Sequence, residues 1–369
     1  MRVDRLRSAE RLAAAANRLG DLGLDALVVA PSPDLAYLLG YDPMPLERPT
    51  LLVIVPDGSS TLIVPMLERS LAMGSPAADE LNVMAWRDGE DPYAIAAGAL
   101  PADGRVALGD RIWGVHLLGL QAAAPALMWA SAAPVVGALR ARKDPAELEA
   151  LRRAGAAADA TFAAIATLPF AGRREREIAA DLARLLVEHG HARAEFTIVA
   201  SGPNAASPHH EPGERTIVIG DLVVLDFGGV LDGYFSDTTR TVIVGEEPSG
   251  EMVTVHDVVR GAYEAAVAAV RPGIEIQEVD RAARAVIRDA GFEDAFIHRT
   301  GHGIGLELHE PPYAVEGDRT VLEPGMTFSV EPGIYLEGRF GVRIEDIVAV
   351  TEDGVERLNR STRELKVVN

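Results

Sequence analysis

The chain has 369 residues, of which 48% are hydrophobic and 24% charged, as is typical of a globular protein with about two domains. Its formal net charge of −20 argues against binding to nucleic acid or anionic membranes, because no broad basic surface is available. It contains no cysteine, so disulfides and thiolate metal sites are excluded, and any metal must bind oxygen and imidazole ligands.

The N-terminal third alternates helical patterns with short apolar runs. Residues 1–24 carry charges throughout and predict an amphipathic helix, not a signal peptide. No stretch reaches the ~18 uninterrupted apolar residues of a membrane span, so we expect a cytoplasmic protein. Turns containing Pro and Gly separate four predicted strands, at 25–30, 50–55, 60–65 and 105–110. This pattern predicts a small α/β domain with a mixed sheet over residues 1–137.

A second domain is predicted over residues 138–369, and it begins with a clearly marked helix. Asp144 suits the N-cap, Pro145 the first turn, and Glu147 the positive end of the helix dipole. The Ala-rich helix that follows is expected to end near Ala166.

This second domain contains a weak internal repeat. Residues 171–190 can be laid on residues 272–291 with two glycines and a Glu–aliphatic pair in register. The pattern of each copy predicts two helices followed by a hairpin that carries two acids. We therefore predict an α/β (α+β) domain made of two halves related by a pseudo-twofold axis, with a site between them.

Two pairs of acids stand in apolar, strand-forming segments. Asp226 and Asp237 belong to the first half, and Glu331 and Glu345 to the second. Buried carboxylates repel one another and resist desolvation, so strands would not normally hold them together without a cation.

Hairpin symmetry predicts that the acids of each pair face each other. A turn-prone GGVLDG segment lies between Asp226 and Asp237, and a symmetric hairpin with its midpoint halfway between the two acids would place them opposite one another. Glu331 and Glu345 are equidistant from Gly338, although Pro332 is expected to disturb pairing there.

Four acids and the Gly-flanked His302 make a donor set for two divalent cations. Oxygen-rich sites with one imidazole suit Mn²⁺, Co²⁺, Zn²⁺ or Fe²⁺. Two such ions can hold a bridging hydroxide and polarise a carbonyl, which implies hydrolysis of an amide, ester or phosphoester.

The motifs, taken in order, resemble those of the pita-bread metallopeptidases, the family of methionine aminopeptidase, aminopeptidase P and prolidase. The matching segments are LDFGG, SDTTRT, TGHGIGLELHE, VEPGIY and GVRIED. The N-terminal domain is similar in size and placement to the one that precedes the catalytic domain in the prolidase and aminopeptidase P branch. The resemblance implies a C-terminal pita-bread (creatinase/aminopeptidase-like) domain.

The resemblance also implies a role for each acid. Asp226 would bind one metal and His302 the other, while Asp237 and Glu345 would bridge both. Glu331 would ligate the second metal and act in catalysis by carrying a proton.

Further residues are implied around the metals. His209 and His309 match the PH and HE positions of the family and would act in catalysis on the substrate carbonyl or the proton. His210 is a weaker alternative to His209. His298 is expected at the edge of the substrate pocket, and Arg343 is expected to hold a metal-binding carboxylate in place. Tyr234 and Tyr335 are either pocket or core residues.

The function implied is hydrolysis of Xaa-Pro peptide bonds by two divalent ions, with Mn²⁺ favoured and Co²⁺ or Zn²⁺ as alternatives. A dipeptidase (prolidase) acting on short proline-containing peptides is favoured, and an aminopeptidase P acting on longer peptides is the alternative. A homodimer is expected. Just after the HE motif this chain has Pro312 and Tyr313, where some prolidases have a segment that resembles HEYPR. An arginine that could bind the carboxylate of a dipeptide is therefore missing from this segment. A noncatalytic pita-bread binding module and a different dinuclear hydrolase, such as a phosphotriesterase, are more remote alternatives.

Overall fold

The computed structural model describes residues 5–369, so residues 1–4 of the predicted N-terminal helix lie outside the described residues. The chain forms two compact units, and the boundary between them falls after Arg140. An ion pair of 2.7 Å between Arg140 and Asp34 ties the last stretch before this boundary to the N-terminal unit. None of the helices among the described residues is long and apolar enough to cross a bilayer.

The N-terminal unit is built on a six-stranded mixed sheet in the order β4-β3-β2-β1-β5-β6. Its strands are β1 (Ala26–Val29), β2 (Leu51–Ile54), β3 (Ser60–Pro65), β4 (Asn82–Trp86), β5 (Gly104–Leu108) and β6 (Leu127–Ser131). Its helices are α1 (Arg5–Leu22), α2 (Pro33–Leu39), α3 (Arg69–Met73), α4 (Pro92–Ala97) and α5 (Gly114–Ala123), followed by the short α6 (Ala138–Ala141) at the boundary.

The four predicted strands form the centre of this sheet, and the two that the sequence did not reveal are its edges, β4 and β6. Edge strands bury less of their surface, and much of β4 and β6 is exposed or half-buried. The apolar pattern that marks a central strand is therefore weak in both.

The C-terminal unit repeats one arrangement twice. The first half contains α7 (Pro145–Ile165), α8 (Glu175–Glu188), β7 (Arg193–Ser201), β8 (Leu222–Leu231), β9 (Tyr234–Phe235) and β10 (Thr238–Val244). The second half contains α9 (Gly250–Ala269), α10 (Gln277–Asp289), β11 (Gly301–Gly303), β12 (Glu310–Ala314), β13 (Thr327–Val330), β14 (Gly333–Leu336), β15 (Phe340–Arg343) and β16 (Asp346–Val350), and the chain ends with β17 (Val355–Arg357) and β18 (Lys366–Val368).

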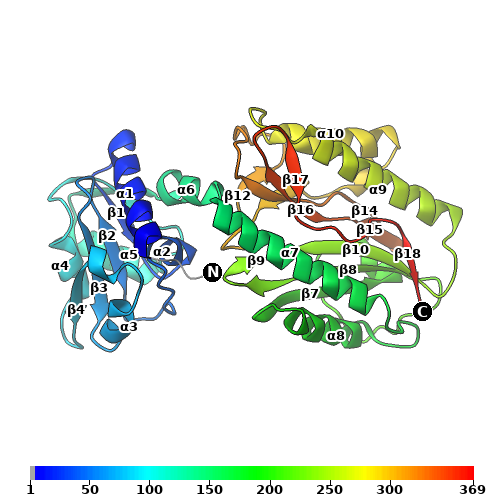
Figure 1. Cartoon of the computed structure of the whole chain (residues 1–369), viewed down its shortest axis with the longest axis horizontal. Coiled ribbons are helices and arrows are strands. Elements are labelled where there is room, and N and C mark those ends of the chain that lie inside the picture. The colour runs from blue at the N-terminus through cyan, green and yellow to red at the C-terminus, as the bar shows by residue number, and fades with distance from the viewer. Residues whose placement is uncertain (1–4) are drawn as a thin grey trace. The chain divides into compact units, whose positions relative to one another are not determined.

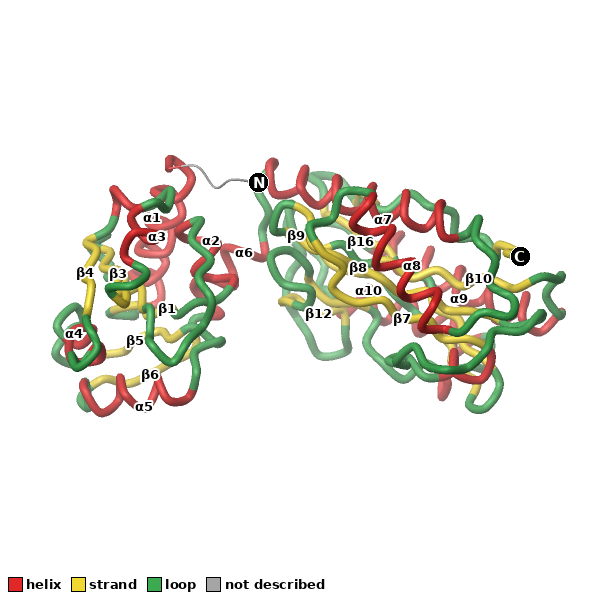
Figure 2. Tube along the Cα trace, turned by 90° about the horizontal axis from the view of Figure 1, so that it is seen from below, coloured by secondary structure: helices red, strands yellow, loops and turns green. Residues whose placement is uncertain are grey.

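Within this unit the strands lie between two pairs of helices, α7 with α8 on one side and α9 with α10 on the other (Figures 1 and 2). One sheet has the order β18-β10-β8-β7, with β9 on β8, and the other has the order β12-β11-β13-β16-β17. A buried apolar core joins α7 and α8 to the first sheet, and a second core joins α9 and α10 to the strands of the second half. The predicted order of helix, helix and acid-bearing hairpin is confirmed in both halves.

The first helix of the unit begins as the sequence predicted. The Asp144 side chain accepts hydrogen bonds from the backbone N–H groups of Ala146 and Glu147, and the Glu147 side chain accepts one from the N–H of Asp144. This reciprocal capping box fixes where α7 starts.

Candidate metal and catalytic site

The first pair of acids lies on one face of the β8–β10 ladder, but not directly opposite each other. Asp226 on β8 pairs with Thr239, so the predicted facing pair with Asp237 is wrong by two residues. The turn is centred on Asp232 and Gly233, whose φ angles are 52° and 86°. Two left-handed residues favour a tight two-residue turn at this point and set the register of the hairpin. Asp237 follows β9 and sits diagonally from Asp226.

The second pair of acids is in the predicted register but lies at a break in the ladder. The pairing of β13 with β16 and that of β14 with β15 share one register, which sets Glu331 opposite Glu345. Neither backbone N–H bonds across this pair. The N–H of Glu331 donates to Thr300 O at 2.8 Å, and that of Glu345 donates to Thr239 O at 3.1 Å. The break therefore attaches Glu345 to the first half of the domain.

His302 is the central residue of β11, and its flanking glycines allow the neighbouring backbone to approach closely. A Cβ at Gly301 would lie 1.8 Å from Ser329 O, and a Cβ at Gly303 would lie 2.4 Å from Glu310 O. Only glycine fits at either position, which explains the TGHG sequence around the histidine.

The imidazole of His302 presents a free lone pair to the acids. Its Nδ1–H donates to Gly303 O at 3.1 Å, which leaves Nε2 as an acceptor. Nε2 lies 3.6 Å from Asp237 Oδ2 and 3.5 Å from Glu331 Oε1, with room for a cation between these atoms. Fixing the tautomer through the second ring nitrogen is how proteins orient a metal-binding histidine.

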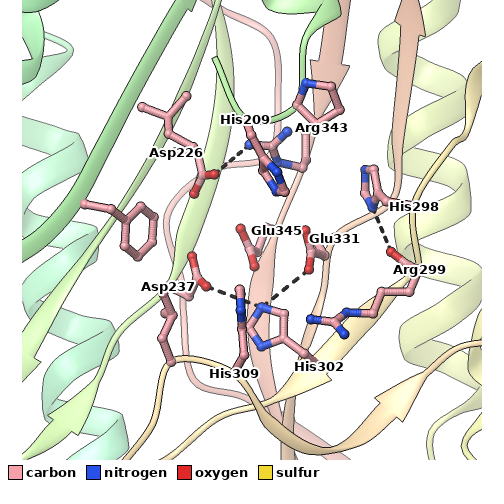
Figure 3. A pocket seen from close by; sticks show the side chains of 14 residues that line it. His209, Asp226, Asp237, His298, Arg299, His302, His309, Glu331, Arg343 and Glu345 are labelled. Atoms are coloured by element: carbon pink, nitrogen blue, oxygen red, sulfur yellow. Dashed lines mark hydrogen bonds and ion pairs between the residues drawn. The ribbon is translucent and has the colours of Figure 1, made fainter. Parts of the chain in front are cut away.

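All nine of the residues singled out as site residues line one cavity of about 460 Å³. The acids and His302 point towards a common centre, with His209 and His309 beside them (Figure 3). The complete lining consists of Phe196, Ile198, Pro208, His209, Asp226, Asp237, His298, Arg299, His302, Leu308, His309, Glu331, Arg343 and Glu345.

The donor atoms fit a metal site. One ligand atom each from Asp237, His302 and Glu345 lies within 4.8 Å of the other two. Three buried carboxylate oxygens have no hydrogen-bond partner among residues 5–369, namely Asp226 Oδ1, Asp237 Oδ1 and Glu345 Oε1. Buried oxygens normally have partners, so three orphaned ones around a single cavity indicate places for cations.

The pKa shifts of the acids also indicate that positive charge is missing from the cavity. Burial, together with repulsion from Asp226, raises the pKa of Asp237 well above its usual value, and burial with repulsion from Asp237 does the same for Glu345. Burial raises the pKa of Glu331 to about 7, with Asp226 adding to the shift and Arg343 opposing it. Burial and the nearby His309 lower the pKa of His302 to about 3, so its imidazole is neutral at neutral pH. Divalent cations would stabilise the ionised carboxylates and accept the neutral imidazole as a ligand.

Arg343 holds one of the acids in place. Its guanidinium donates to Asp226 Oδ2 at 2.6 Å and to the Tyr335 hydroxyl at 2.8 Å. Tyr335 also contacts His298 Nε2 at 2.8 Å, so this tyrosine belongs to the site. Tyr234 does not, because its hydroxyl donates to Glu147 within the core.

The two candidate catalytic histidines lie near the acids on separate loops. The rings of His309 and His302 are 4.0 Å apart in an edge-to-face arrangement. His209 lines the cavity, whereas its neighbour His210 turns away and contacts Glu175 Oε2 at 2.8 Å. The structure therefore distinguishes His209 from the weaker alternative.

Sequence reasoning missed several residues of the site, and two of them are polar residues beside the acids. Arg299 lines the cavity, and the Thr239 hydroxyl donates to Glu345 Oε2 at 2.7 Å. Thr239 was detectable in principle as part of the SDTTRT motif. Arg299 carries no such signal, since a single arginine before a short strand is an ordinary feature of a sequence.

The comparisons with known proteins agree with this two-domain fold. The model of the metallopeptidase family M24 matches residues 149–352, and that of the creatinase/prolidase N-terminal domain matches residues 11–142. Together they define a two-domain metallopeptidase with a pita-bread catalytic domain. The chain belongs to metallopeptidase family M24.

Similar proteins match along the whole chain. The crystal structure of dipeptidase PepE from Mycobacterium ulcerans is 44% identical, covers 100% of both chains and has a TM-score of 0.96. The Xaa-Pro dipeptidase of Lactobacillus delbrueckii subsp. lactis is 36% identical over 95% of this chain and 97% of that protein. The structure of an X-Pro aminopeptidase from Thermotoga maritima is 30% identical over 95% of this chain and 100% of that chain, with a TM-score of 0.81.

Proposed function

We propose that this metallopeptidase is a Xaa-Pro dipeptidase that uses two divalent metal ions. The observation that carries the proposal is the convergence of four carboxylates and one neutral imidazole on a single cavity, where three of the buried oxygens have no hydrogen-bond partner within residues 5–369. The similarity to dipeptidases along the whole chain supports the choice of substrate class.

Five side chains hold the ions in this proposal. Asp226 would help to hold one ion, His302 and Glu331 would help to hold the other, and Asp237 and Glu345 would be shared by both. Oxygen-rich ligation favours Mn²⁺, with Co²⁺ or Zn²⁺ as alternatives. Bound divalent ions supply Lewis acidity, which polarises a carbonyl and lowers the pKa of water.

The protein's own groups orient the peptide and move protons. The imidazoles of His209 and His309 stand beside the acids and donate hydrogen bonds to the oxygen of the scissile carbonyl. Glu331 would accept and return the proton as well as help to hold an ion, the role that the resemblance to the family implies. Arg343 keeps the Asp226 carboxylate oriented, and His298 lines the substrate side of the cavity.

A Xaa-Pro aminopeptidase that acts on longer peptides is the second candidate. Some prolidases have the segment HEYPR after the metal-binding histidine, where this chain has HEPPY. Tyr313 therefore occupies the position of the arginine in those prolidases. The M24 family membership and the complete ligand set argue against a noncatalytic binding module.

Hydrolysis assays test the proposal. Protein reconstituted separately with Mn²⁺, Co²⁺ and Zn²⁺ is incubated with Gly-Pro, Ala-Pro and Ala-Pro-Ala. We expect cleavage of the two dipeptides, with Mn²⁺ the best activator. Cleavage of the tripeptide at a comparable rate would favour the aminopeptidase, and no turnover of any of the three with any of the metals would refute both.

We also propose a cytoplasmic homodimer, which rests on the resemblance to the prolidase branch. Light scattering on the purified protein is expected to give twice the chain mass of 39.2 kDa. Fractionation of the source cells is expected to recover the protein with cytoplasmic markers.

A further inference from the structure

Arg299 is a cation fixed at the wall of the cavity. The backbone on either side of it is held by α10, because Thr300 donates two hydrogen bonds to Asp280 Oδ1, at 2.7 and 3.1 Å, and Arg284 donates to His298 O at 2.5 Å. The Arg299 side chain extends from this anchored segment towards the metal-binding residues (Figure 3). Its position is therefore built into the fold.

The guanidinium of Arg299 rests on an aromatic ring, and its charge also acts on Glu331, whose pKa it lowers. Its central carbon lies 4.4 Å from the centroid of the Tyr313 ring, a distance typical of a cation–π contact. Tyr313 pairs with His302 across β11 and β12, so this contact holds the guanidinium beside the metal-binding histidine. After burial itself, Arg299 is the largest influence that lowers the pKa of His309, as expected for a cation close to that imidazole.

The two arginines of the cavity differ in how many of their N–H donors already have a partner. Arg343 is occupied by Asp226 at 2.6 Å and by Tyr335. No carboxylate of the described chain lies within 4.0 Å of the Arg299 guanidinium, and its N–H groups donate to no atom there. Arg299 is therefore the cation of this cavity whose donors are free for a ligand.

A free carboxylate is the ligand that these donors fit best. The planar guanidinium can donate two parallel hydrogen bonds to a carboxylate and compensate its charge, whereas a peptide carbonyl offers one neutral acceptor. A Xaa-Pro dipeptide ends in such a carboxylate one residue after the scissile bond, and a longer peptide has an amide there. From these observations we infer that Arg299 binds the C-terminal carboxylate of the dipeptide and so sets the length of the substrate, a role that rests on the proposed function.

Arg299 supplies this charge from a different place in the sequence than the HEYPR arginine of some prolidases. In this chain Tyr313 occupies that position, and its ring contacts the guanidinium of Arg299. The missing arginine of the HEPPY segment is thus replaced in space by a residue that precedes the metal-binding histidine.

Paired substrates test the inference. Metal-loaded wild type and the Arg299→Gln and Arg299→Lys variants are assayed on Ala-Pro and on Ala-Pro amide, which differ only at the terminal carboxylate. Losing a charged hydrogen bond typically weakens binding by about 10- to 100-fold, so Arg299→Gln should raise KM for Ala-Pro by that factor and change kcat much less. KM for the amide should be unchanged in Arg299→Gln. The KM of Arg299→Lys for Ala-Pro should lie between the values for wild type and Arg299→Gln. Arg319→Gln, at a largely exposed arginine of the same domain, is the matched control.

Binding of proline provides a second measurement that needs no turnover. Calorimetry on metal-loaded protein compares L-proline with L-prolinamide, and we expect the preference for proline in wild type to disappear in Arg299→Gln. Circular dichroism and metal content establish that each variant is folded and loaded. If Arg299→Gln keeps the wild-type preference for the free carboxylate in both experiments, the inference is wrong. If wild type cleaves no Xaa-Pro substrate, the proposed function fails, and the proline measurement still decides whether Arg299 binds carboxylates.

Discussion

The two halves of the catalytic domain have the same order of elements but present their acids in different ways. In the first half, Asp226 lies within a continuous ladder between β8 and β10. In the second, Glu331 and Glu345 lie where the ladder splits into the pairs β13–β16 and β14–β15. The repeat supplies a common scaffold, and local differences in pairing allow the ligands to converge.

The acids also differ in how the backbone beside them is paired. Asp226 projects from a regular ladder and Asp237 from the short gap between β9 and β10, whereas the glutamates lie at a break whose backbone bonds to other segments. One of these bonds, from Glu345 N to Thr239 O, joins the second half to the first. The metal site therefore also depends on contacts between the halves.

The halves also differ in how they anchor their histidine loops. His209 is followed by His210, which contacts the buried Glu175 at 2.8 Å. His309 is followed by Glu310, which forms a buried ion pair of 2.6 Å with Lys143. The first loop is thus tied to a buried anion and the second to a buried cation.

The largest effect is expected from the acids proposed to bridge the ions. Asp237→Asn and Glu345→Gln should each lower kcat/KM by on the order of 10³-fold or more, which exceeds the 10–100-fold typical of losing a group that only supports a metal ligand. Metal analysis should show a loss of bound ions in both variants. Equal losses of bound metal in Asp237→Asn and Glu345→Gln would mean that the two halves contribute equally to the shared ligation. Full activity in either variant would contradict its bridging role, and Asp289→Asn, at an exposed position, is the control.

The anchors of the two histidine loops should differ in their effect on stability. Lys143→Met removes the buried cation that pairs with Glu310, and breaking a buried pair in this way costs about 3–5 kcal/mol of unfolding free energy. Glu175→Gln keeps one acceptor oxygen for the surrounding donors and should cost about 1–3 kcal/mol. Urea unfolding of the metal-loaded variants measures both changes. The double variant Lys143→Met/Glu310→Leu should regain much of the loss, and failure to do so would show that the charge imbalance is not its cause.

Arg343 tests how the second half supports the first, because it lies on β15 and holds Asp226 on β8. Arg343→Lys keeps the charge but loses the forked geometry, so metal affinity should fall by about 10- to 100-fold. Metal titration by calorimetry measures the change. Arg339→Lys, on the same hairpin but half exposed, should leave affinity unchanged, and an equal effect of the two substitutions would argue against a specific role for Arg343.

The last test is the pH dependence of metal binding. The pKa of Glu331 is raised to about 7, so below that value a proton must leave its carboxyl before a metal can bind. Apparent metal affinity should rise with pH by about tenfold per pH unit for each displaced proton, and more than one proton is involved because the pKa values of Asp237 and Glu345 are raised as well. For the metal-free protein, the contribution of Glu331 to stability falls as the pH rises from the ordinary value of 4.5 through about 7, because the folded state holds the proton more tightly than the unfolded chain does. Glu331→Gln should remove this part of the pH dependence, and an unchanged profile would contradict the assignment.

Much of the site could be predicted from the sequence because metal chemistry depends strongly on residue type. The carboxylates and His302 were recognisable from their placement in apolar strands and a Gly-rich segment, and the repeat indicated that two halves would bring them together. The start of α7 was equally clear, since its capping box is formed by residues close in sequence.

Tertiary structure decided the features that depend on distant or subtle choices. The register of the first hairpin was set by which two residues adopt a positive φ, and Asp232 with Gly233 shifted it by two positions from the symmetric prediction. The edge strands β4 and β6 escaped prediction because they bury too little surface to show a strong apolar pattern.

The chain by itself thus determined which groups can bind metal and in what order they occur. Only the fold decided which charges are already compensated, because that depends on neighbours far away in the sequence. Arg343 is compensated by Asp226, whereas Arg299 rests on Tyr313 with its donors free. Coulombic and hydrogen-bonding partners act through space at a few ångströms, so the difference between these two arginines could be seen only in the folded protein.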